Sequence, residues 1–167
     1  MSNYLKFGAM IATSTAIMLL LMYSNTFAWA HLTWSETRFY MAFVMGAAMT
    51  VIMLSFMLGM YSNKRMNIGI YALAGLVFIG SLWLVRSQVT VEDRSWMSAM
   101  IPHHSIAILT SERSNIEDLR VRELADEIIE AQRREIEEMK WLIEDIKTNG
   151  PAVSKASVDA RPVPDFD

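Results

Sequence analysis

The sequence SWMSAMIPHHSIAILTSE, residues 95–112, holds the side chains with the clearest capacity for chemistry. His103 and His104 stand side by side, and Met97 and Met100 precede them at neighbouring helical turns. Imidazole nitrogen together with thioether sulfur suits soft ions such as Cu(I) or Ag(I) better than zinc, magnesium or calcium. The segment therefore raises the hypothesis of a soft-metal site.

The residue types of the whole chain narrow the possible chemistry. There is no cysteine, so disulfides and thiolate ligands are excluded, and any metal must be held by histidine, carboxylate or methionine. The sequence shows no nucleophile–base pair and no phosphate-binding glycine loop, so we do not expect an enzyme. A structural interpretation stays open. In it, Pro102 kinks a helix, the histidines are ordinary polar residues at its end, and the methionines pack in a core.

A second helix is expected over residues 118–147, between a polar break and the stop signal TNGP. Stepping along it by four and three residues gives an apolar seam with two polar positions. The positions of this seam are Val121, Ala125, Ile128, Gln132, Glu135, Met139, Leu142 and Ile146. Burying Gln132 and Glu135 in such a seam is costly unless both find partners.

The polar positions of the two helices are predicted to lie close together. If the chain folds back in the polar break, Met97 lies level with Glu135. Met100 then lies level with Gln132, and the histidine pair falls about one turn away, near Ile128. Such a two-helix hairpin buries too little to be stable alone, so it must pack against the membrane helices or against a second copy. We expect the second copy, because a homodimer completes a four-helix bundle.

Two segments of this region resemble the domain-of-unknown-function family 305 (DUF305). They are MIPHHSIAI, residues 100–108, and LADEIIEAQRREIEEM, residues 124–139. The resemblance covers about residues 93–147 and implies a ferritin-like helical bundle, with some members associated with periplasmic copper or silver binding. It implies the metal-site candidates Met97, Met100, His103, His104, Gln132, Glu135 and Met139. Soluble members usually have a longer domain, so the short hairpin here favours completion by dimerisation.

Three long uncharged runs precede this region, and they predict a membrane domain. The runs are 7–35, 39–63 and 66–85. Each reaches the roughly 20 residues that a helix needs to cross a bilayer, and a soluble helix of that length would carry a charged face. The expected membrane helices are about 7–30, 37–61 and 67–86. The predicted domains are a three-helix transmembrane domain at 1–89, an extracytoplasmic hairpin at 90–149 and a disordered tail at 150–167.

The charges predict how the chain is oriented. Residues 1–86 carry five basic residues and one acidic residue, whereas residues 87–167 carry ten basic and seventeen acidic residues. The acidic half disfavours nucleic acid as a partner. Lys6, Lys64 and Arg65 are expected in the cytoplasm, because basic residues gather on that side of a membrane. The N-terminus would then be cytoplasmic and the C-terminal domain periplasmic, in a bacterial inner membrane.

The end of the first membrane helix leaves one alternative open. FAWA, residues 27–30, resembles a signal-peptidase site, although the uncharged run is longer than a usual signal segment. We favour an uncleaved helix, and cleavage after Ala30 would still leave the C-terminal half outside. His31 lies just beyond, where it could complete a site with the hairpin, but we favour a polar residue at the membrane interface.

A ladder of methionines at every fourth position marks the second membrane helix. Its members are Met41, Met45, Met49, Met53 and Met57. They could relay Cu(I) through the membrane, but each step turns by roughly 40°, so the ladder winds around the helix. We favour ordinary packing against lipid and neighbouring helices.

These observations predict an all-α protein in which three transmembrane helices anchor a homodimeric, ferritin-like half-bundle. Its expected function is to bind a soft metal ion, with copper as the leading candidate, for metal tolerance or delivery. The alternative is a metal-free interaction or scaffold module. In that case the His-His-Pro motif is structural, and Gln132 and Glu135 set the register of a dimer.

Overall fold

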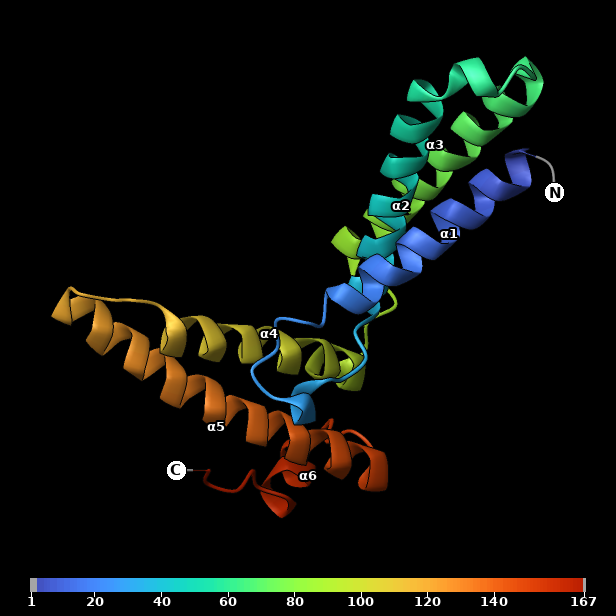
Figure 1. Cartoon of the computed structure of the whole chain (residues 1–167). Coiled ribbons are helices and arrows are strands. Elements are labelled where there is room, and N and C mark those ends of the chain that lie inside the picture. Colours follow the sequence, from blue (N-terminus) through green and yellow to red (C-terminus); the bar gives the residue numbers. More distant parts are fainter. Residues whose placement is uncertain (1–2, 167) are drawn as a thin grey trace. The chain divides into compact units, whose positions relative to one another are not determined.

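The computed structural model describes residues 3–166, which contain helices and no strand, as predicted for an all-α chain. The helices in chain order are α1 (Asn3–Leu21), η1 (Trp29–His31), α2 (Glu36–Phe56), η2 (Leu58–Met60), α3 (Lys64–Ser87), α4 (Asp93–Arg113), α5 (Leu119–Asn149) and α6 (Lys155–Ala160) (Figure 1). The described chain divides into two compact units, 3–24 with 36–91 and 25–35 with 92–166. We call them the membrane unit and the hairpin unit.

The membrane unit contains the three apolar helices α1, α2 and α3. Each of them is long and apolar enough to cross a membrane, as the uncharged runs predict. Helix α2 packs along both α1 and α3. Gly46 allows α1 to come close, because a Cβ atom at this position would overlap the side chain of Thr15. The compartment and the orientation stay predictions.

The first membrane helix is shorter than predicted. It was expected to reach about residue 30, whereas α1 ends at Leu21. The uncharged run continues beyond that point, but residues 25–35 leave the helix and belong to the hairpin unit. We call residues 25–35 the strap. An uncharged run sets an upper limit on a membrane helix, and it does not mark where the helix ends.

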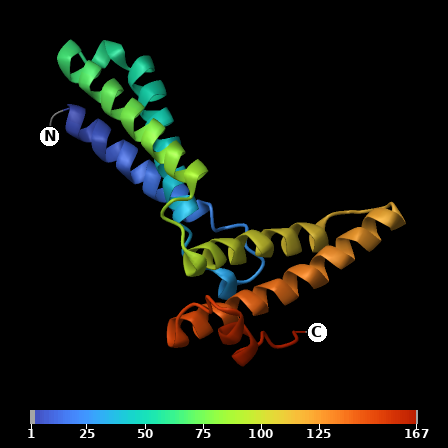
Figure 2. The ribbon, with the colours of Figure 1, turned by 180° about the vertical axis from the view of Figure 1, so that it is seen from behind.

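The hairpin unit is built on α4 and α5, which lie side by side along much of their length (Figure 2). Asp118 caps the start of α5 by accepting the Arg120 backbone N–H at 2.9 Å. Gly150 ends it with a φ of +75°, a conformation that glycine adopts at little cost. The two helices share one apolar core of buried side chains: Met97, Ile101, Ile108, Ile129, Ile136 and Met139.

The seam of α5 runs one residue away from the predicted seam at two positions. Ile129 and Ile136 are buried, whereas Ile128 is 36% exposed and the Glu135 side chain is 44% exposed. The predicted seam would have buried a carboxylate, which is costly. Rotating the helix by one position replaces it with Ile136 and leaves Glu135 at the edge of the seam.

The chain after Gly150 differs from the disordered tail that the sequence predicts. It contains the short helix α6, whose start is capped reciprocally by Ser154 and Ser157. Arg161 Nη1 then binds Asp145 at 2.7 Å, and its Nη2 donates to the Gly150 carbonyl at 3.2 Å. These contacts hold the segment against the end of α5.

Candidate metal site

The two helices of the hairpin meet in a different register from the one predicted. His104 was expected near Ile128, but its Nε2 lies 2.8 Å from Glu135 Oε2, seven residues further along α5. Seven residues are two helical turns, and a shift of one heptad presents nearly the same face. The apolar pattern therefore fits both registers equally well. The predicted pairing of Met97 with Glu135 is wrong, and Glu135 instead meets His104.

The ring of His104 is held in one orientation by its own helix. Its Nδ1 lies 2.9 Å from the Met100 carbonyl oxygen, one turn earlier in α4. A carbonyl oxygen can only accept a hydrogen bond, so Nδ1 carries a proton and donates it. In the neutral ring Nε2 then presents its lone pair to Glu135.

A lone pair and a carboxylate oxygen 2.8 Å apart repel each other unless a cation lies between them. At 2.8 Å the two atoms are at direct hydrogen-bond distance, so that cation is a second proton, on the imidazole or on Glu135. A metal ion would bind each atom at roughly 2 Å and would take the place of this proton, with the carboxylate moving away from the ring. A metal-binding histidine commonly donates its other ring N–H to a backbone carbonyl, as His104 does to Met100. The arrangement is therefore a hydrogen-bonded pair, and its imidazole is already oriented as a metal-bound imidazole would be.

Access to this pair is one-sided. The His104 side chain is 12% exposed and the Glu135 side chain is 44% exposed. An ion can therefore approach from the Glu135 side, while the imidazole sits against the seam. Gln132 lies on the same side of α5 and donates from Nε2 to Glu135 Oε2 at 3.3 Å. Its amide orients the carboxylate and could add an oxygen ligand after rotation.

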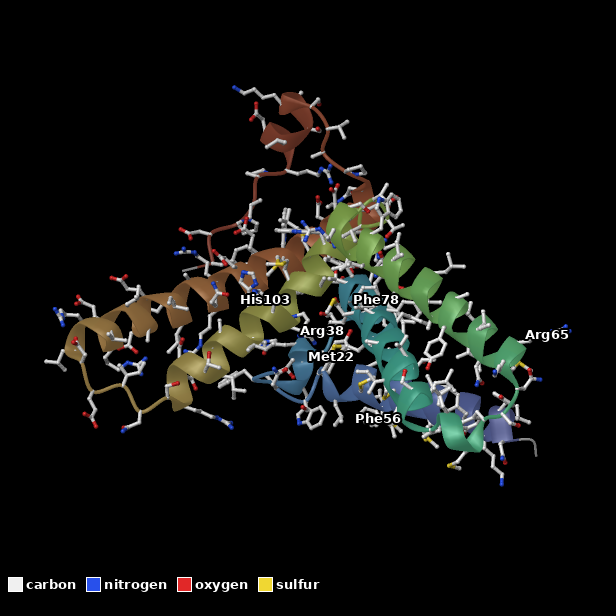
Figure 3. All side chains as sticks on the ribbon, turned by 90° about the horizontal axis from the view of Figure 1, so that it is seen from above. Met22, Arg38, Phe56, Arg65, Phe78 and His103 are labelled. Atoms are coloured by element: carbon white, nitrogen blue, oxygen red, sulfur yellow. The ribbon has the colours of Figure 1, made fainter. Side chains whose placement is uncertain are left out.

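The other predicted site residues fall into two groups. Met97 and Met139 are buried in the hairpin core, and Met100 is partly buried against it. All three belong to the apolar cluster that α4 and α5 share. His103 is exposed on α4, and its ring centroid lies 6.2 Å from that of His104 (Figure 3). The structure brings His104, Gln132 and Glu135 together and leaves His103 outside the seam.

Few histidine and acidic side chains lie near the His104–Glu135 pair. Within residues 3–166, no three or more histidine and acidic side chains form a group that could hold a metal ion. His104 and Glu135 supply two such groups. A four-coordinate site would therefore need the amide of Gln132, thioether sulfur, or groups from a second copy of the chain.

The family described as "Domain of unknown function (DUF305)" matches residues 47–148, more than half of the 167-residue chain. The chain belongs to this family. The resemblance seen in the sequence is therefore confirmed, and the DUF305 match also extends further, starting within α2 and ending near the end of α5. It includes both partners of the His104–Glu135 pair.

One curated relative is an uncharacterized protein of Acanthamoeba polyphaga mimivirus. It is 34% identical over 73 residues, which are 42% of this chain and 48% of that protein. The chain thus spans about half the length of the curated relative that it matches. No solved structure matches the chain. Neither the family nor this relative has a described activity, so the function of this DUF305 protein rests on its own site.

The strap precedes the residues matched to DUF305 and belongs to the hairpin unit, although the uncharged run placed its first half in the first membrane helix. The Phe27 backbone N–H donates to Ser105 Oγ at 2.7 Å, and His31 Nδ1 lies 2.9 Å from the same oxygen. Ser105 is completely buried on α4, next to the His-His pair in sequence. His31 thus joins the hairpin unit through Ser105. From the sequence, a contact of His31 with the hairpin was the less favoured expectation, behind a polar residue at the membrane interface.

Pro102 creates the second attachment point of the strap. Proline has no N–H, so the Ser98 carbonyl, four residues earlier in α4, loses its usual helical donor. Thr33 Oγ1 donates to this carbonyl at 2.6 Å. The proline of the DUF305 motif therefore supplies an acceptor that the strap satisfies, and α4 continues through it from Asp93 to Arg113.

The electrostatic surroundings favour neutral His31. Burial lowers the pKa of His31, and nearby Lys140 lowers it further, while Glu137 raises it. Ser105 Oγ already accepts the Phe27 N–H, so its own hydrogen is available for the lone pair of His31 Nδ1. The strap is therefore best attached when His31 carries its single proton on Nε2.

Proposed function

We propose that this DUF305 protein is a membrane-anchored binding protein for a soft metal ion, with Cu(I) as the leading candidate. The ion would be bound beside the seam of the α4–α5 hairpin, for metal tolerance or delivery. The single observation that supports the proposal is the orientation of His104. Its Nδ1 donates to Met100 O, and its Nε2 faces Glu135 Oε2 at 2.8 Å.

The neighbouring donors favour a soft ion over a hard one. Calcium takes about six to eight oxygen ligands, and magnesium prefers six in an octahedron. The pair offers one carboxylate and one amide beside an imidazole. Further ligands could come from the thioether sulfur atoms of Met97, Met100 and Met139 in the hairpin core. Methionine is flexible enough to turn a sulfur toward an ion, and Cu(I) accepts both sulfur and imidazole.

A second candidate function needs no metal. The described residues offer no group of three histidine or acidic side chains, so a second proton on His104 could be the cation. The pair would then be an ion pair that fixes the heptad register, and the hairpin would serve as an interaction or scaffold module. In this case loss of Glu135 would affect folding and leave metal handling unchanged.

We further propose that the hairpin unit forms a homodimer outside the cytoplasm. Its two long helices bury one small core, and apolar residues of α5 remain exposed. These are Leu119, Val121, Leu124 and Ile128. A second copy would cover this surface and complete a four-helix bundle. The proposed side of the membrane rests on Lys6, Lys64 and Arg65, which favour the cytoplasm at the opposite end of the helices.

The decisive experiment is a Cu(I) competition titration against a colorimetric chelator, with full-length protein in detergent. We expect the wild type to compete and His104→Ala to lose at least about tenfold in affinity while keeping its helical content. His103→Ala is the matched control, since His103 lies outside the seam, and it should bind like the wild type. Equal competition by the wild type and His104→Ala would refute the proposed site. A stoichiometry of half an ion per chain would place the ion between two copies.

A further inference from the structure

The membrane unit contains an apolar groove of about 640 Å³. All three membrane helices line it, and α1 contributes from Tyr4 to Leu19. Fifteen residue steps along a helix correspond to roughly 22 Å, so the groove is long as well as apolar. Its volume falls within the ~300–1,000 Å³ typical of ligand pockets.

Small side chains open this groove. Gly8, Ala12 and Ala16 follow one another at every fourth position of α1 and line it. Residues at this spacing lie on one side of a helix. Their side chains are too small to fill the space beside α1. Helices α1 and α3 both pack along α2, and the groove includes residues from all three helices.

One end of the groove is basic. Tyr4 and Met66 line this end, and the Tyr4 hydroxyl donates to Asn67 Oδ1 at 2.9 Å, which fixes α1 to α3 there. Lys64 and Arg65 directly precede Met66 at the start of α3. Lys6 follows Tyr4 by two residues, about 200° around α1, so it lies on the side of that helix away from the groove. All three basic side chains are exposed, and within residues 3–166 none of them takes part in an ion pair.

The opposite end of the groove has a different character. Leu19, Phe39 and Phe43 line it, and they offer hydrocarbon and aromatic surface alone. A ligand that matches the whole groove must therefore be a long apolar chain with a negative group at one end. A phospholipid with an anionic headgroup has this chemistry.

We propose that the groove binds one acyl chain of an anionic glycerophospholipid from the surrounding bilayer. Lys64 and Arg65 bind its headgroup at the basic end; Arg65 lies near the start of α3 (Figure 3). Anionic lipids attract basic residues next to membrane helices, and they are abundant on the cytoplasmic side. The predicted orientation places the basic end on that side.

The shape of the groove favours an acyl chain over a helix from a second copy. A helix with its side chains is ~10–12 Å across, and a membrane-spanning length of it is ~30 Å long. Such a helix has several times the volume of the groove and could lie only across its mouth. A single extended hydrocarbon chain can enter it and contact all three helices.

The test is native mass spectrometry of the full-length protein, released from micelles that contain equimolar phosphatidylglycerol and phosphatidylcholine with identical acyl chains. We expect the wild type to retain about one phosphatidylglycerol per chain, with at least a fivefold preference over phosphatidylcholine. The double variant Lys64→Gln/Arg65→Gln should lose this preference. Ala12→Phe, which fills the groove from an exposed position on α1, should lower the retention of both lipids at least tenfold.

Two matched controls separate the groove from general effects. Arg86→Gln removes a basic residue at the other end of α3, and Leu76→Phe adds bulk at an exposed position of α3 that does not line the groove. Both should retain lipid like the wild type, with unchanged helical content by circular dichroism. Retention by Ala12→Phe at the level of the wild type would overturn the proposal. So would a dimer that carries no lipid and dissociates in Ala12→Phe, because a second copy would then occupy the groove.

Discussion

At the scale of single residues, the hairpin unit contains two histidines with opposite requirements. His104 faces the Glu135 carboxylate and needs a cation between the two groups. His31 accepts from Ser105, and its burial favours the neutral ring. The difference arises from the neighbouring atoms, because one ring meets an acceptor and the other meets a hydroxyl that can donate.

Attachment of the strap should therefore depend on pH. The pKa of His31 in the attached state lies below its ordinary value of about 6.5, with burial as the main cause, Lys140 as the second, and Glu137 opposing them. The released strap binds a proton more readily, so attachment is strongest above pH 6.5 and weakens as the pH falls through that value.

Hydrogen exchange of the Phe27 amide measures this effect, because that amide donates to Ser105 Oγ. After correction for the intrinsic exchange rate, its protection should be lower at pH 5.5 than at pH 7.5. In His31→Gln, which keeps a polar side chain without titrating, the protection should vary much less with pH. A wild-type protection that stays constant across this range would show that His31 does not control the strap.

At the scale of the helices, the sequence predicted the elements better than their contacts. The uncharged runs predicted three apolar helices, and the segments 95–112 and 118–147 predicted the two helices of the hairpin. The sequence could not show which face of α5 forms the seam. Ile128 and Ile129 are equally apolar, and only their burial in the structure distinguishes them. The register was not decided either, because a heptad pattern fits after a shift of seven residues.

The strap could not be predicted from the sequence for a related reason. Its residues continue the uncharged run of α1, and hydropathy alone does not distinguish a membrane helix from a loop that packs on another unit. The partnership of Thr33 with the Ser98 carbonyl depends on tertiary structure. Pro102 predicts that one carbonyl of its helix lacks a backbone donor. The sequence did not show which group would donate to that carbonyl instead.

The link between Pro102 and Thr33 predicts a coupled pair of substitutions. Thr33→Val removes the hydroxyl that satisfies the Ser98 carbonyl, and it should destabilise strap attachment by about 1 kcal/mol. Pro102→Ala restores a backbone N–H that can donate to the same carbonyl. In the Pro102→Ala background, Thr33→Val should therefore cost clearly less.

A double-mutant cycle on the protection of the Phe27 amide measures this coupling. Ser24→Ala is a suitable control, since its hydroxyl donates to the Leu21 carbonyl in the membrane unit and takes no part in the strap. Additive effects of the two substitutions would show that the carbonyl freed by Pro102 does not hold the strap.

At the scale of the whole molecule, a membrane unit carries a hairpin unit with little core of its own. Two amphipathic helices leave apolar surface uncovered, and α5 exposes 55% of Leu124 and 49% of Val121. A small hairpin that dimerises removes this surface from water and gains stability from it. The proposed dimer and the proposed metal site are separable by position along α5, because Leu124 stands 11 residues before Glu135, which is roughly 16 Å along the helix.

The dimer predicts a change of mass on substitution of the exposed apolar surface. Leu124→Glu should shift the detergent-solubilised protein from dimer to monomer in size-exclusion chromatography with light scattering. The cause is the cost of burying a charge in the interface. Val153→Glu introduces the same charge at an 89% exposed position of the C-terminal segment, and it should leave the mass unchanged. A wild type that is already monomeric at micromolar concentration would contradict the dimer.

In the proposed site, His104 binds a soft ion through Nε2, together with sulfur from the hairpin core. X-ray absorption at the copper edge of the Cu(I)-loaded full-length protein tests it most directly, because it distinguishes imidazole nitrogen from thioether sulfur around the metal. We predict one imidazole and at least one sulfur ligand in the wild type and in His103→Ala, and loss of the imidazole signal in His104→Ala. A spectrum without sulfur, or one unchanged by His104→Ala, would contradict the proposed site.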